Sequence, residues 1–352
     1  MNALSVSRLD SQPRRILLVL PTWASDVVMA TPFIRSLFAH FSQAEIHLLM
    51  HRRLLPVLEG SPWINRVHFW APRTKTAEAR AAQRELIHTL RGCDFDLAVL
   101  LPNSFRSAWL SYQAGARRRI GFARDGRGLL LTDKIAAPNR VRGGFQPMPL
   151  CDYYGALAEA LGMPHPGDRV ELFLVDHADA AVDARLAQAG VKPHQPLVVV
   201  SPGGEHGSAE YFAMVADQLA ARFDVAIVIA PEAADESVAS AMADAMNAPA
   251  CLLNAPCLSI GELKSLMADA DLLLGVEGDL RQYATAFETP QVTVFGTNDP
   301  RWSAISHRLE IGLGFDGRTA GGASRSIDRK QVPTIAVEDV LAACEAQLNT
   351  VL

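Results

Sequence analysis

The sequence predicts an α/β protein with two parallel sheets, because one pattern of apolar runs and turns occurs twice in the chain. The first copy spans residues 14–51 and the second spans residues 196–232. Each copy has a short apolar run, a turn rich in Gly, Pro or Ser, an amphipathic helix and a second apolar run. Continuous apolar runs suit strands buried on both faces, so each copy is expected to open a parallel sheet covered by helices.

The length of 352 residues suits two domains of ordinary size. A Pro-His-Pro-Gly segment at residues 164–167 begins the expected linker. We therefore place an N-terminal domain at residues 1–170 and a C-terminal domain at residues 171–352. Two such sheets facing each other would enclose a cleft.

Individual elements follow from the apolar runs and the turn residues between them. The predicted strands are Ile16 to Leu20, Ile46 to Met50, Phe95 to Leu101, Leu197 to Ser201, Val225 to Ala230, Cys251 to Leu253, Leu272 to Gly275 and Val292 to Phe295, and a further strand is expected to begin at Arg117 to Ile120. A closing helix is expected from Val337 to Leu352, with Leu341, Cys344 and Leu348 on one face. Residues 138–149 and 309–332 are predicted to be irregular.

The composition, 49% hydrophobic and 20% charged, is typical of a soluble globular protein. No run approaches the roughly 20 apolar residues that span a bilayer. The N-terminus lacks the charged and apolar pattern of a secretion signal, so we expect a cytoplasmic protein. Five scattered cysteines without C-x-x-C spacing favour reduced thiols over a zinc site or disulfides.

Positive charge is concentrated between Asn103 and Arg142, where nine Arg and Lys residues face two Asp residues, although the whole chain carries a net charge of −5. Arginine binds carboxylates and phosphates in a bidentate manner, so this stretch favours an anionic partner. A solvated surface would explain the same composition. Nucleic acid is disfavoured, because the rest of the chain is acidic and aromatic residues are sparse here.

The first turn, P-T-W-A-S-D at residues 21–26, follows the first predicted strand. Ligands bind outside the carboxyl ends of strands in open α/β sheets, so Asp26 is a candidate site residue. The alternative is a structural role as a helix N-cap or as a first-turn acid.

Several segments between residue 14 and about residue 305 resemble the ADP-heptose:lipopolysaccharide heptosyltransferases, glycosyltransferase family 9. They are I-L-L-V-L-P-T-W-A-S-D, A-V-L-L-P-N-S-F-R-S-A-W, R-R-I-G-F, S-P-G-G-E-H-G-S-A and D-L-L-L-G-V-E-G-D-L-R-Q. The resemblance implies the GT-B fold of two facing Rossmann-like domains. It implies that residues 1–170 receive the acceptor and that residues 171–352 receive the nucleotide sugar.

The resemblance also implies an activity and a set of site residues. A sugar, a heptose, would move with inversion and without a metal or cofactor from a nucleoside diphosphate donor such as ADP-heptose. The acceptor would be an anionic glycolipid of lipopolysaccharide core type, which is compatible with peripheral contact at the inner membrane face. Asp26 is the implied catalytic base. The expected donor-binding residues are Gly203, Gly204, Glu205, Ser208, Glu277, Gly278, Asp279 and Arg281, and the expected acceptor-binding residues are Asn103, Ser104, Arg106, Arg118 and Arg119.

The donor half departs from the family pattern in two places. Relatives usually carry a Lys or Arg followed by Trp-Pro after the glycine-rich turn, whereas here Ser208 and Ala209 lead directly into Glu210. Relatives usually read Asp-Ser/Thr-Gly-x-x-His where this chain has E-G-D-L-R-Q at residues 277–282. We expect Arg281 to supply the lost cation from the start of a helix, unless it is a surface residue paired with Asp279 or Glu288.

Other functions remain compatible with these patterns. Because both departures lie in the donor half, a non-catalytic protein that binds a glycan or nucleotide, or that partners another transferase, is the main alternative. Another GT-B enzyme, such as a sugar epimerase, is a further alternative. A nicotinamide-dependent enzyme is disfavoured, because neither turn contains G-x-G-x-x-G.

Overall fold

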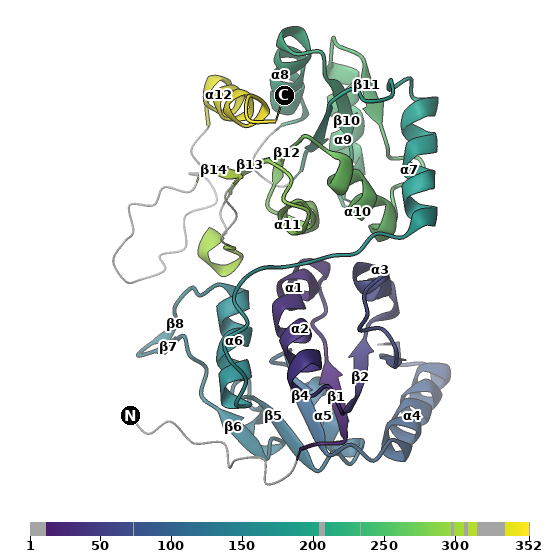
Figure 1. The fold of residues 1–352 in the computed structure, drawn as a ribbon, viewed down its shortest axis with the longest axis vertical. Coiled ribbons are helices and arrows are strands. Elements are labelled where there is room, and N and C mark those ends of the chain that lie inside the picture. Colours follow the sequence, from purple (N-terminus) through teal and green to yellow (C-terminus); the bar gives the residue numbers. More distant parts are fainter. Residues whose placement is uncertain are drawn as a thin grey trace. The chain divides into compact units, whose positions relative to one another are not determined.

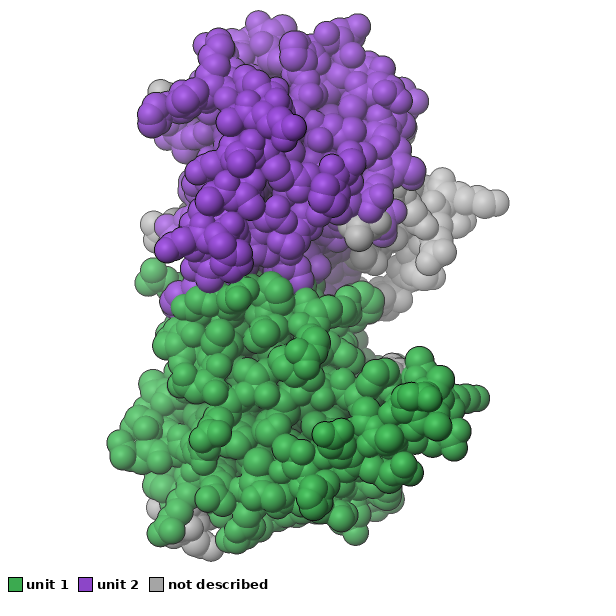
Figure 2. Space-filling view, turned by 90° about the vertical axis from the view of Figure 1, so that its right-hand side faces the viewer, with its two compact units in different colours: residues 1–170 green, residues 171–352 purple. Residues whose placement is uncertain are grey.

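The structure, a computed structural model, describes residues 12–72, 74–203, 208–232, 234–296, 299–305, 309–314 and 335–351. The chain divides into two compact units, residues 1–170 and 171–352, which Figure 2 colours separately. Each unit contains one six-stranded sheet, and all pairings within these two sheets are parallel. The predicted α/β class with two parallel sheets is therefore confirmed.

The sheet of the first unit has the strand order β3-β2-β1-β4-β5-β6 (Figure 1). Its strands are β1 (Arg15–Val19), β2 (Glu45–Met50), β3 (Val67–Phe69), β4 (Leu97–Leu100), β5 (Arg118–Phe122) and β6 (Asp133–Ile135). Its helices are α1 (Ala24–Met29), α2 (Thr31–His40), α3 (Leu55–Leu58), α4 (Ala77–Gly92), α5 (Phe105–Gln113) and α6 (Leu150–Ala160), with 3-10 turns at Arg52–Leu54 and Arg127–Leu129. A separate antiparallel pair consists of β7 (Arg140–Val141) and β8 (Gly144–Phe145).

The sheet of the second unit repeats this plan with the order β11-β10-β9-β12-β13-β14. Its strands are β9 (Leu197–Ser201), β10 (Ala226–Ile229), β11 (Ala250–Leu252), β12 (Leu272–Val276), β13 (Gln291–Val294) and β14 (Glu310–Leu313). Its helices are α7 (Asp176–Gln188), α8 (Ala209–Arg222), α9 (Glu236–Ala245), α10 (Ile260–Asp269), α11 (Asp279–Ala286) and α12 (Val337–Leu348), with a 3-10 turn at Pro300–Trp302.

The central strands are buried on both faces, as their continuous apolar sequences predict. Residues 16–19 of β1 are fully buried, and alternate side chains pack with α4 and α5 on one side of the sheet. In the second unit, α12 completes the core through Leu341, Cys344 and Leu348, so the predicted closing helix and its apolar face are confirmed.

Three local predictions differ from the structure. Residues 138–149 contain the β7–β8 pair instead of only a loop. The region 309–332 was predicted to be irregular, but it contains β14, which extends the sheet beside β13; residues 315–332 lie outside the described residues. Helix α7 was not predicted, because its alternating acidic and alanine residues give no clear apolar face. In the described part of the chain, no helix has the length and apolar character needed to cross a bilayer.

Candidate functional site

The strand order creates a topological switch point in each unit, between β1 and β4 and between β9 and β12. In open parallel sheets, ligands bind in the crevice outside the carboxyl ends of the strands at such a point. Asp26 and Asn103 follow β1 and β4, whereas Gly203 and Glu277 follow β9 and β12. These four predicted residues therefore lie at the switch point of their own sheet.

Asp26 is the third residue of α1 and is partly buried. It is not the N-cap, because Trp23 occupies that position without a side-chain capping bond. The carboxylate lies close enough to the buried Tyr154 for its charge to matter: burial, and then the charge of Asp26, raise the pKa of the Tyr154 hydroxyl. Asp26 is thus a partly accessible acid at the sheet edge, backed by a hydroxyl that stays protonated.

Asn103 is held in place by a buried arginine that the motif did not reveal. The Arg127 side chain is fully buried and donates to the Oδ1 atom of Asn103 over 3.1 Å and to the carbonyl of Phe122 over 2.9 Å. The Tyr153 hydroxyl lies 3.2 Å from the same Oδ1 atom. Burial lowers the pKa of Arg127 to about 10, which still leaves it charged at neutral pH. Asn103 is therefore fixed through its oxygen.

Ser104 and Arg106 lie at the start of α5, at the same edge of the sheet. Ser104 is the N-cap of α5, and its hydroxyl accepts the amide of Ser107 over 3.2 Å. The Arg106 guanidinium donates to the carbonyl of Ala71 over 2.9 Å and lies 4.6 Å from the centre of the Trp70 ring. Ser104 thus has a structural role in starting the helix.

The prediction that Arg118 and Arg119 bind the acceptor is not supported by their positions. Both residues begin β5, beside the start of β4, and so lie at the opposite edge of the sheet from Asp26. Arg118 binds both carboxylate oxygens of Asp133, at 3.1 and 2.5 Å. Arg119 donates to the carbonyls of Leu130 and Ala116 over 2.7 and 2.6 Å. These two arginines hold β5 to its neighbours.

The carboxyl edge of the first sheet carries two arginines that the sequence analysis missed. Arg52 and Arg53 follow β2 after His51, in the 3-10 turn. The Arg53 guanidinium donates to the carbonyl of Thr22 over 2.9 Å and lies 5.8 Å from the centre of the exposed Trp23 ring. Arg53 therefore lies beside the turn that carries Asp26. The Arg-Arg pair just after the second predicted strand could have indicated positive charge at this end of the sheet.

In the second unit, the turn after β9 is arranged around Gly203. A Cβ atom at this position would lie 2.5 Å from the Cγ atom of Asp235, so a glycine is needed for the acid to approach the backbone. Ser208 is the N-cap of α8, and its hydroxyl accepts the amide of Tyr211 over 3.2 Å. Gly204 and Glu205 lie outside the described residues, so their predicted roles stay predictions.

A partly buried carboxylate lies at the start of α11, beside the turn after β12. Glu232, which follows β10, accepts the amides of Asp279 over 2.6 Å and of Leu280 over 3.4 Å through its Oε1 atom. A Cβ atom on Gly278 would lie only 2.2 Å from this oxygen. Burial, and then the charge of Asp279, raise the pKa of Glu232 to about 7. The sequence analysis missed Glu232, because only the sheet order brings it to Gly278.

Glu277 is the second carboxylate at this edge. Its Oε1 atom accepts the hydroxyl of Ser303 over 2.5 Å. Its Oε2 atom is buried and has no hydrogen-bond partner among the described residues. A buried carboxylate oxygen without a donor is costly, so a ligand hydroxyl that reached this atom after a shift of its surroundings would stabilise it.

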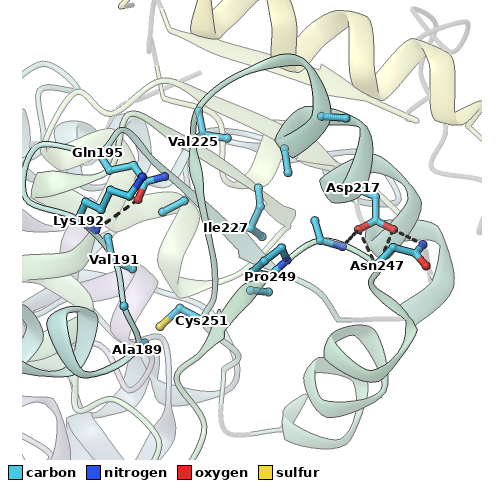
Figure 3. Close-up of a pocket in the computed structure, with 16 residues that line it drawn as sticks. Ala189, Val191, Lys192, Gln195, Asp217, Val225, Ile227, Asn247, Pro249 and Cys251 are labelled. Carbon is cyan, nitrogen blue, oxygen red and sulfur yellow. Dashed lines mark hydrogen bonds between the residues drawn. The ribbon is translucent and has the colours of Figure 1, made fainter.

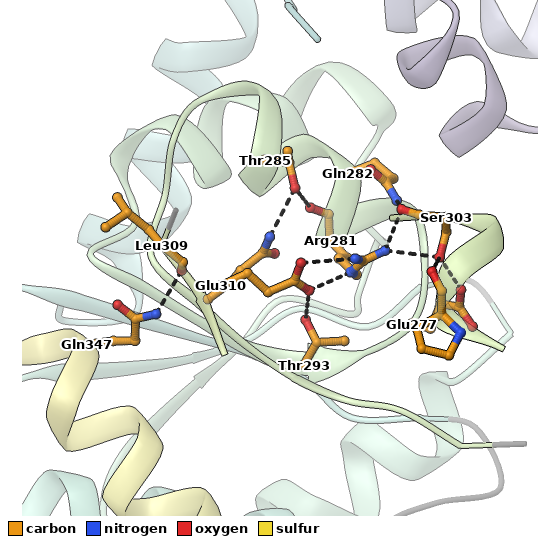
Figure 4. A network of polar contacts seen from close by, with 11 residues as sticks. Glu277, Arg281, Gln282, Thr285, Thr293, Ser303, Leu309, Glu310 and Gln347 are labelled. Carbon is orange, nitrogen blue, oxygen red and sulfur yellow. Dashed lines mark hydrogen bonds and ion pairs between the residues drawn. The ribbon is translucent and has the colours of Figure 1, made fainter. Parts of the chain in front are cut away.

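Arg281 does not project toward a ligand, contrary to the prediction. Its side chain is 4% exposed, and it binds both oxygens of Glu310 over 2.6 and 2.9 Å (Figure 4). It also donates to the carbonyl and the hydroxyl of Ser303, each over 3.1 Å. Pairing with Asp279 or Glu288, the alternative prediction, is also wrong. Arg281 fastens α11 to β14 and to the 3-10 turn, so it does not replace the lost donor cation.

A groove of about 580 Å³ in the second unit lies away from these residues (Figure 3). It is lined by the first residues of β10 and β11, the segment 189–195 and the α8 residue Asp217. Asp217 is occupied there, because it accepts the amides of Asn247 and Ala248 over 3.0 and 2.8 Å. None of the predicted site residues lines this groove.

Two parallel sheets, each with polar residues gathered at its switch point, define an α/β protein of two Rossmann-like units. The chain belongs to glycosyltransferase family 9 (heptosyltransferase), whose model matches residues 83–320. It is therefore a glycosyltransferase, and its fold is GT-B.

Individual relatives agree with this family. The chain is 26% identical over 311 residues to lipopolysaccharide heptosyltransferase 2 of Escherichia coli (strain K12), covering 84% of this chain and 87% of that protein. The structure of a glycosyl transferase family 9 protein from Veillonella parvula DSM 2008 matches with a TM-score of 0.82 at 17% identity, covering 99% and 100% of the two chains. The E. coli ADP-heptose lipopolysaccharide heptosyltransferase II structure matches with a TM-score of 0.72 at 21% identity, covering 96% and 99%.

Proposed function

We propose that the protein transfers a heptose from a nucleoside diphosphate donor, ADP-heptose, to an anionic acceptor of the lipopolysaccharide core type. Membership of the heptosyltransferase family and the names of the relatives support this proposal. The structural observation that carries it is the buried, unpartnered Oε2 atom of Glu277 at the second switch point. A sugar hydroxyl of the donor would supply the missing hydrogen bond.

In the proposed reaction, Asp26 is the general base. It accepts the proton of the acceptor hydroxyl as that oxygen attacks the anomeric carbon of the donor sugar. The bond between this carbon and the diphosphate oxygen breaks in the same displacement, so the anomeric configuration inverts. The position of Asp26 at the carboxyl edge of β1, partly accessible, supports this role.

The leaving diphosphate would be held by the backbone amides at the two donor-side turns, without a metal. In this structure the amides of Asp279 and Leu280 donate to the Glu232 Oε1 atom, so a diphosphate oxygen at the start of α11 would replace that carboxyl group. Backbone amides aimed at the diphosphate oxygens can neutralise a leaving group in this way.

We assign acceptor binding to Asn103 and Arg106, and we add Arg53 to this set. All three lie at the carboxyl edge of the first sheet, where Asp26 lies. Guanidinium groups suit the phosphates and carboxylates of an anionic glycolipid.

The exposed face of α5 suits contact with the membrane that carries such an acceptor, and it supports a cytoplasmic protein bound peripherally. Phe105, Trp109 and Tyr112 are 54%, 43% and 52% exposed and stack in sequence. A groove of about 470 Å³ beside them is lined by Arg80, Arg84 and Arg106. Aromatic rings beside arginines are typical of surfaces that bind anionic lipid headgroups.

Flotation with anionic vesicles tests the membrane contact. We expect the protein to float with the vesicles, and we expect Trp109→Ala combined with Tyr112→Ala to weaken this binding. A change at Trp302, which is 43% exposed in the second unit, is the matched control. Equal binding by the α5 variant and the parent would contradict the proposed contact.

A screen of the purified protein with different nucleotide sugars tests the activity directly. We expect acceptor-dependent release of ADP from ADP-heptose, and undiminished release when a metal chelator is present. Binding of a nucleotide or glycan without any turnover would instead support the non-catalytic alternative. Loss of activity on chelation would contradict the metal-independent mechanism.

A further inference from the structure

A cluster of two histidines and one cysteine in the first unit lies outside the candidate site. His47 is in β2, His68 is in the neighbouring β3, and Cys93 caps the end of α4. The parallel pairing of β2 and β3 places Leu49 beside His68, so the two histidines come close across the strands. This is the only group of three such ligand residues among the residues that the structure describes.

The potential ligand atoms converge. The Nδ1 atom of His47 lies 2.8 Å from the Nε2 atom of His68, and one potential ligand atom from each of the three residues lies within 4.8 Å of the others. A tetrahedral zinc ion needs about 3.3 Å between two nitrogens and about 3.6 Å between nitrogen and sulfur, as its bond lengths imply. To admit the ion, the nitrogens would separate by about half an ångström, and the two rings, whose centres lie 5.1 Å apart, would tilt away from their present head-on line.

The surroundings of His47 match those of a metal ligand. The Oε1 atom of Glu45 lies 3.2 Å from the Nε2 atom of His47, on the side of the ring away from His68. A carboxylate on this side favours the proton on Nε2, although the contact lacks hydrogen-bond geometry. The Nδ1 lone pair then accepts a hydrogen bond from the Nε2 atom of His68, and a metal ion would take the place of that proton. The edge of the ring also packs against Phe95, with ring centres 5.0 Å apart, which fixes its orientation.

We propose that His47, His68 and Cys93 form a zinc site that ties β2, β3 and the end of α4 together. Two imidazoles and a thiolate are ligands that zinc prefers, and the fourth position would be taken by water. His68 and Cys93 are partly exposed, so an ion can enter from solvent. The site is separate from the carboxyl edge of the sheet, so its role is to stabilise the first unit.

Cysteine spacing alone gave no indication of a zinc site, because two of the ligands are histidines brought together by the sheet.

Titration of the full chain with Co²⁺, after treatment with a chelator, tests the proposal. We expect one ion per chain, a thiolate-to-cobalt charge-transfer band in the near ultraviolet and strong visible bands typical of tetrahedral cobalt. Cys93→Ser should abolish the charge-transfer band, and His68→Gln should weaken binding at least about tenfold. Cys257→Ser, which changes a partly exposed thiol of the second unit, is the control and should retain the band.

Zinc should also raise the melting temperature of the parent and of Cys257→Ser, but not that of Cys93→Ser or His68→Gln. The absence of a charge-transfer band in the parent would overturn the proposal, as would a band that survives in Cys93→Ser. These readouts do not use the transferase reaction, so either proposal can fail without the other.

Discussion

The buried pair of Arg281 and Glu310 is expected to matter for stability. Arg281→Ala would remove the guanidinium that pairs with the Glu310 carboxylate, which also accepts the hydroxyl of Thr293. Breaking a buried pair in this way costs about 3–5 kcal/mol, so the free energy of unfolding in urea should fall by that order. Arg301→Ala, which removes a half-exposed pair with Asp299, is the control and should have a much smaller effect.

Calorimetry separates this structural role from donor binding. Because Arg281 contacts Glu310 and Ser303, Arg281→Ala should change the affinities for the nucleoside diphosphate and for the bare nucleoside equally. A loss confined to the diphosphate would mean that Arg281 does bind the phosphates, contrary to the structure.

Glu232 is expected to give the stability a dependence on pH. Its pKa is about 7 in the folded chain, raised by burial and by Asp279 from its ordinary 4.5. The folded chain thus keeps a proton between pH 4.5 and 7 that the unfolded chain has lost, and the Glu232 contribution to the free energy of unfolding falls as the pH rises through this window. The change is on the order of 3 kcal/mol, because the pKa differs by 7 − 4.5 = 2.5 and each pKa unit corresponds to about 1.4 kcal/mol.

Urea unfolding at several pH values tests this prediction. In Glu232→Gln, the free energy of unfolding should no longer fall between pH 4.5 and 7 by the amount that Glu232 contributes. The control Glu159→Gln, which changes an exposed residue, should keep this pH dependence. An identical pH profile in the parent and in Glu232→Gln would show that Glu232 titrates alike in the folded and unfolded chains.

At the scale of elements, the start of α11 depends on the close approach of Glu232 to Gly278. Gly278→Ala would place a Cβ atom 2.2 Å from the Glu232 Oε1 atom, so either the carboxylate or the first turn of α11 must move. We expect a loss of about 1–3 kcal/mol in the free energy of unfolding and weaker binding of the donor nucleotide. Gly92→Ala, where a Cβ atom would meet nothing within 4 Å, is the matched control.

The double variant Gly278→Ala with Glu232→Ala tests whether the loss of stability comes from the clash between the new methyl group and the Glu232 carboxylate. Removing the Glu232 carboxylate clears the space that the new methyl group needs, so the double variant should be less destabilised than the sum of the single variants. Simple additivity of the two changes would mean that the two residues do not meet.

At the scale of the whole molecule, the repeated pattern of apolar runs predicted the central strands of both sheets but not the short strands β3 and β6. The strands and the apolar face of α12 followed from local sequence, because burial on both faces of a parallel sheet leaves continuous apolar runs. Strand β14 could not be predicted in this way. It contains Glu310, which is polar in sequence but is neutralised by Arg281 in the fold.

Site residues could be predicted from the sequence only where they directly follow a predicted strand. Asp26 follows a strand directly, so its edge of the sheet could be predicted. Arg118 and Arg119 open a strand, and their charge alone did not reveal that they lie at the other edge. Glu232 and Arg281 acquire their roles through partners 47 and 29 residues away, which only the strand order brings near.

The turnover of Asp26→Asn tests the central claim, that Asp26 is the base of a glycosyltransferase, most directly. The change keeps the size of the side chain and removes its basicity, so acceptor-dependent release of ADP from ADP-heptose should fall at least about a hundredfold. Folding and nucleotide affinity should be nearly unchanged. Asp152→Asn, which removes the exposed first-turn acid of α6, is the matched control and should keep full activity. Turnover of Asp26→Asn within a few-fold of the parent would contradict the claim and leave Asp26 as a first-turn acid of α1.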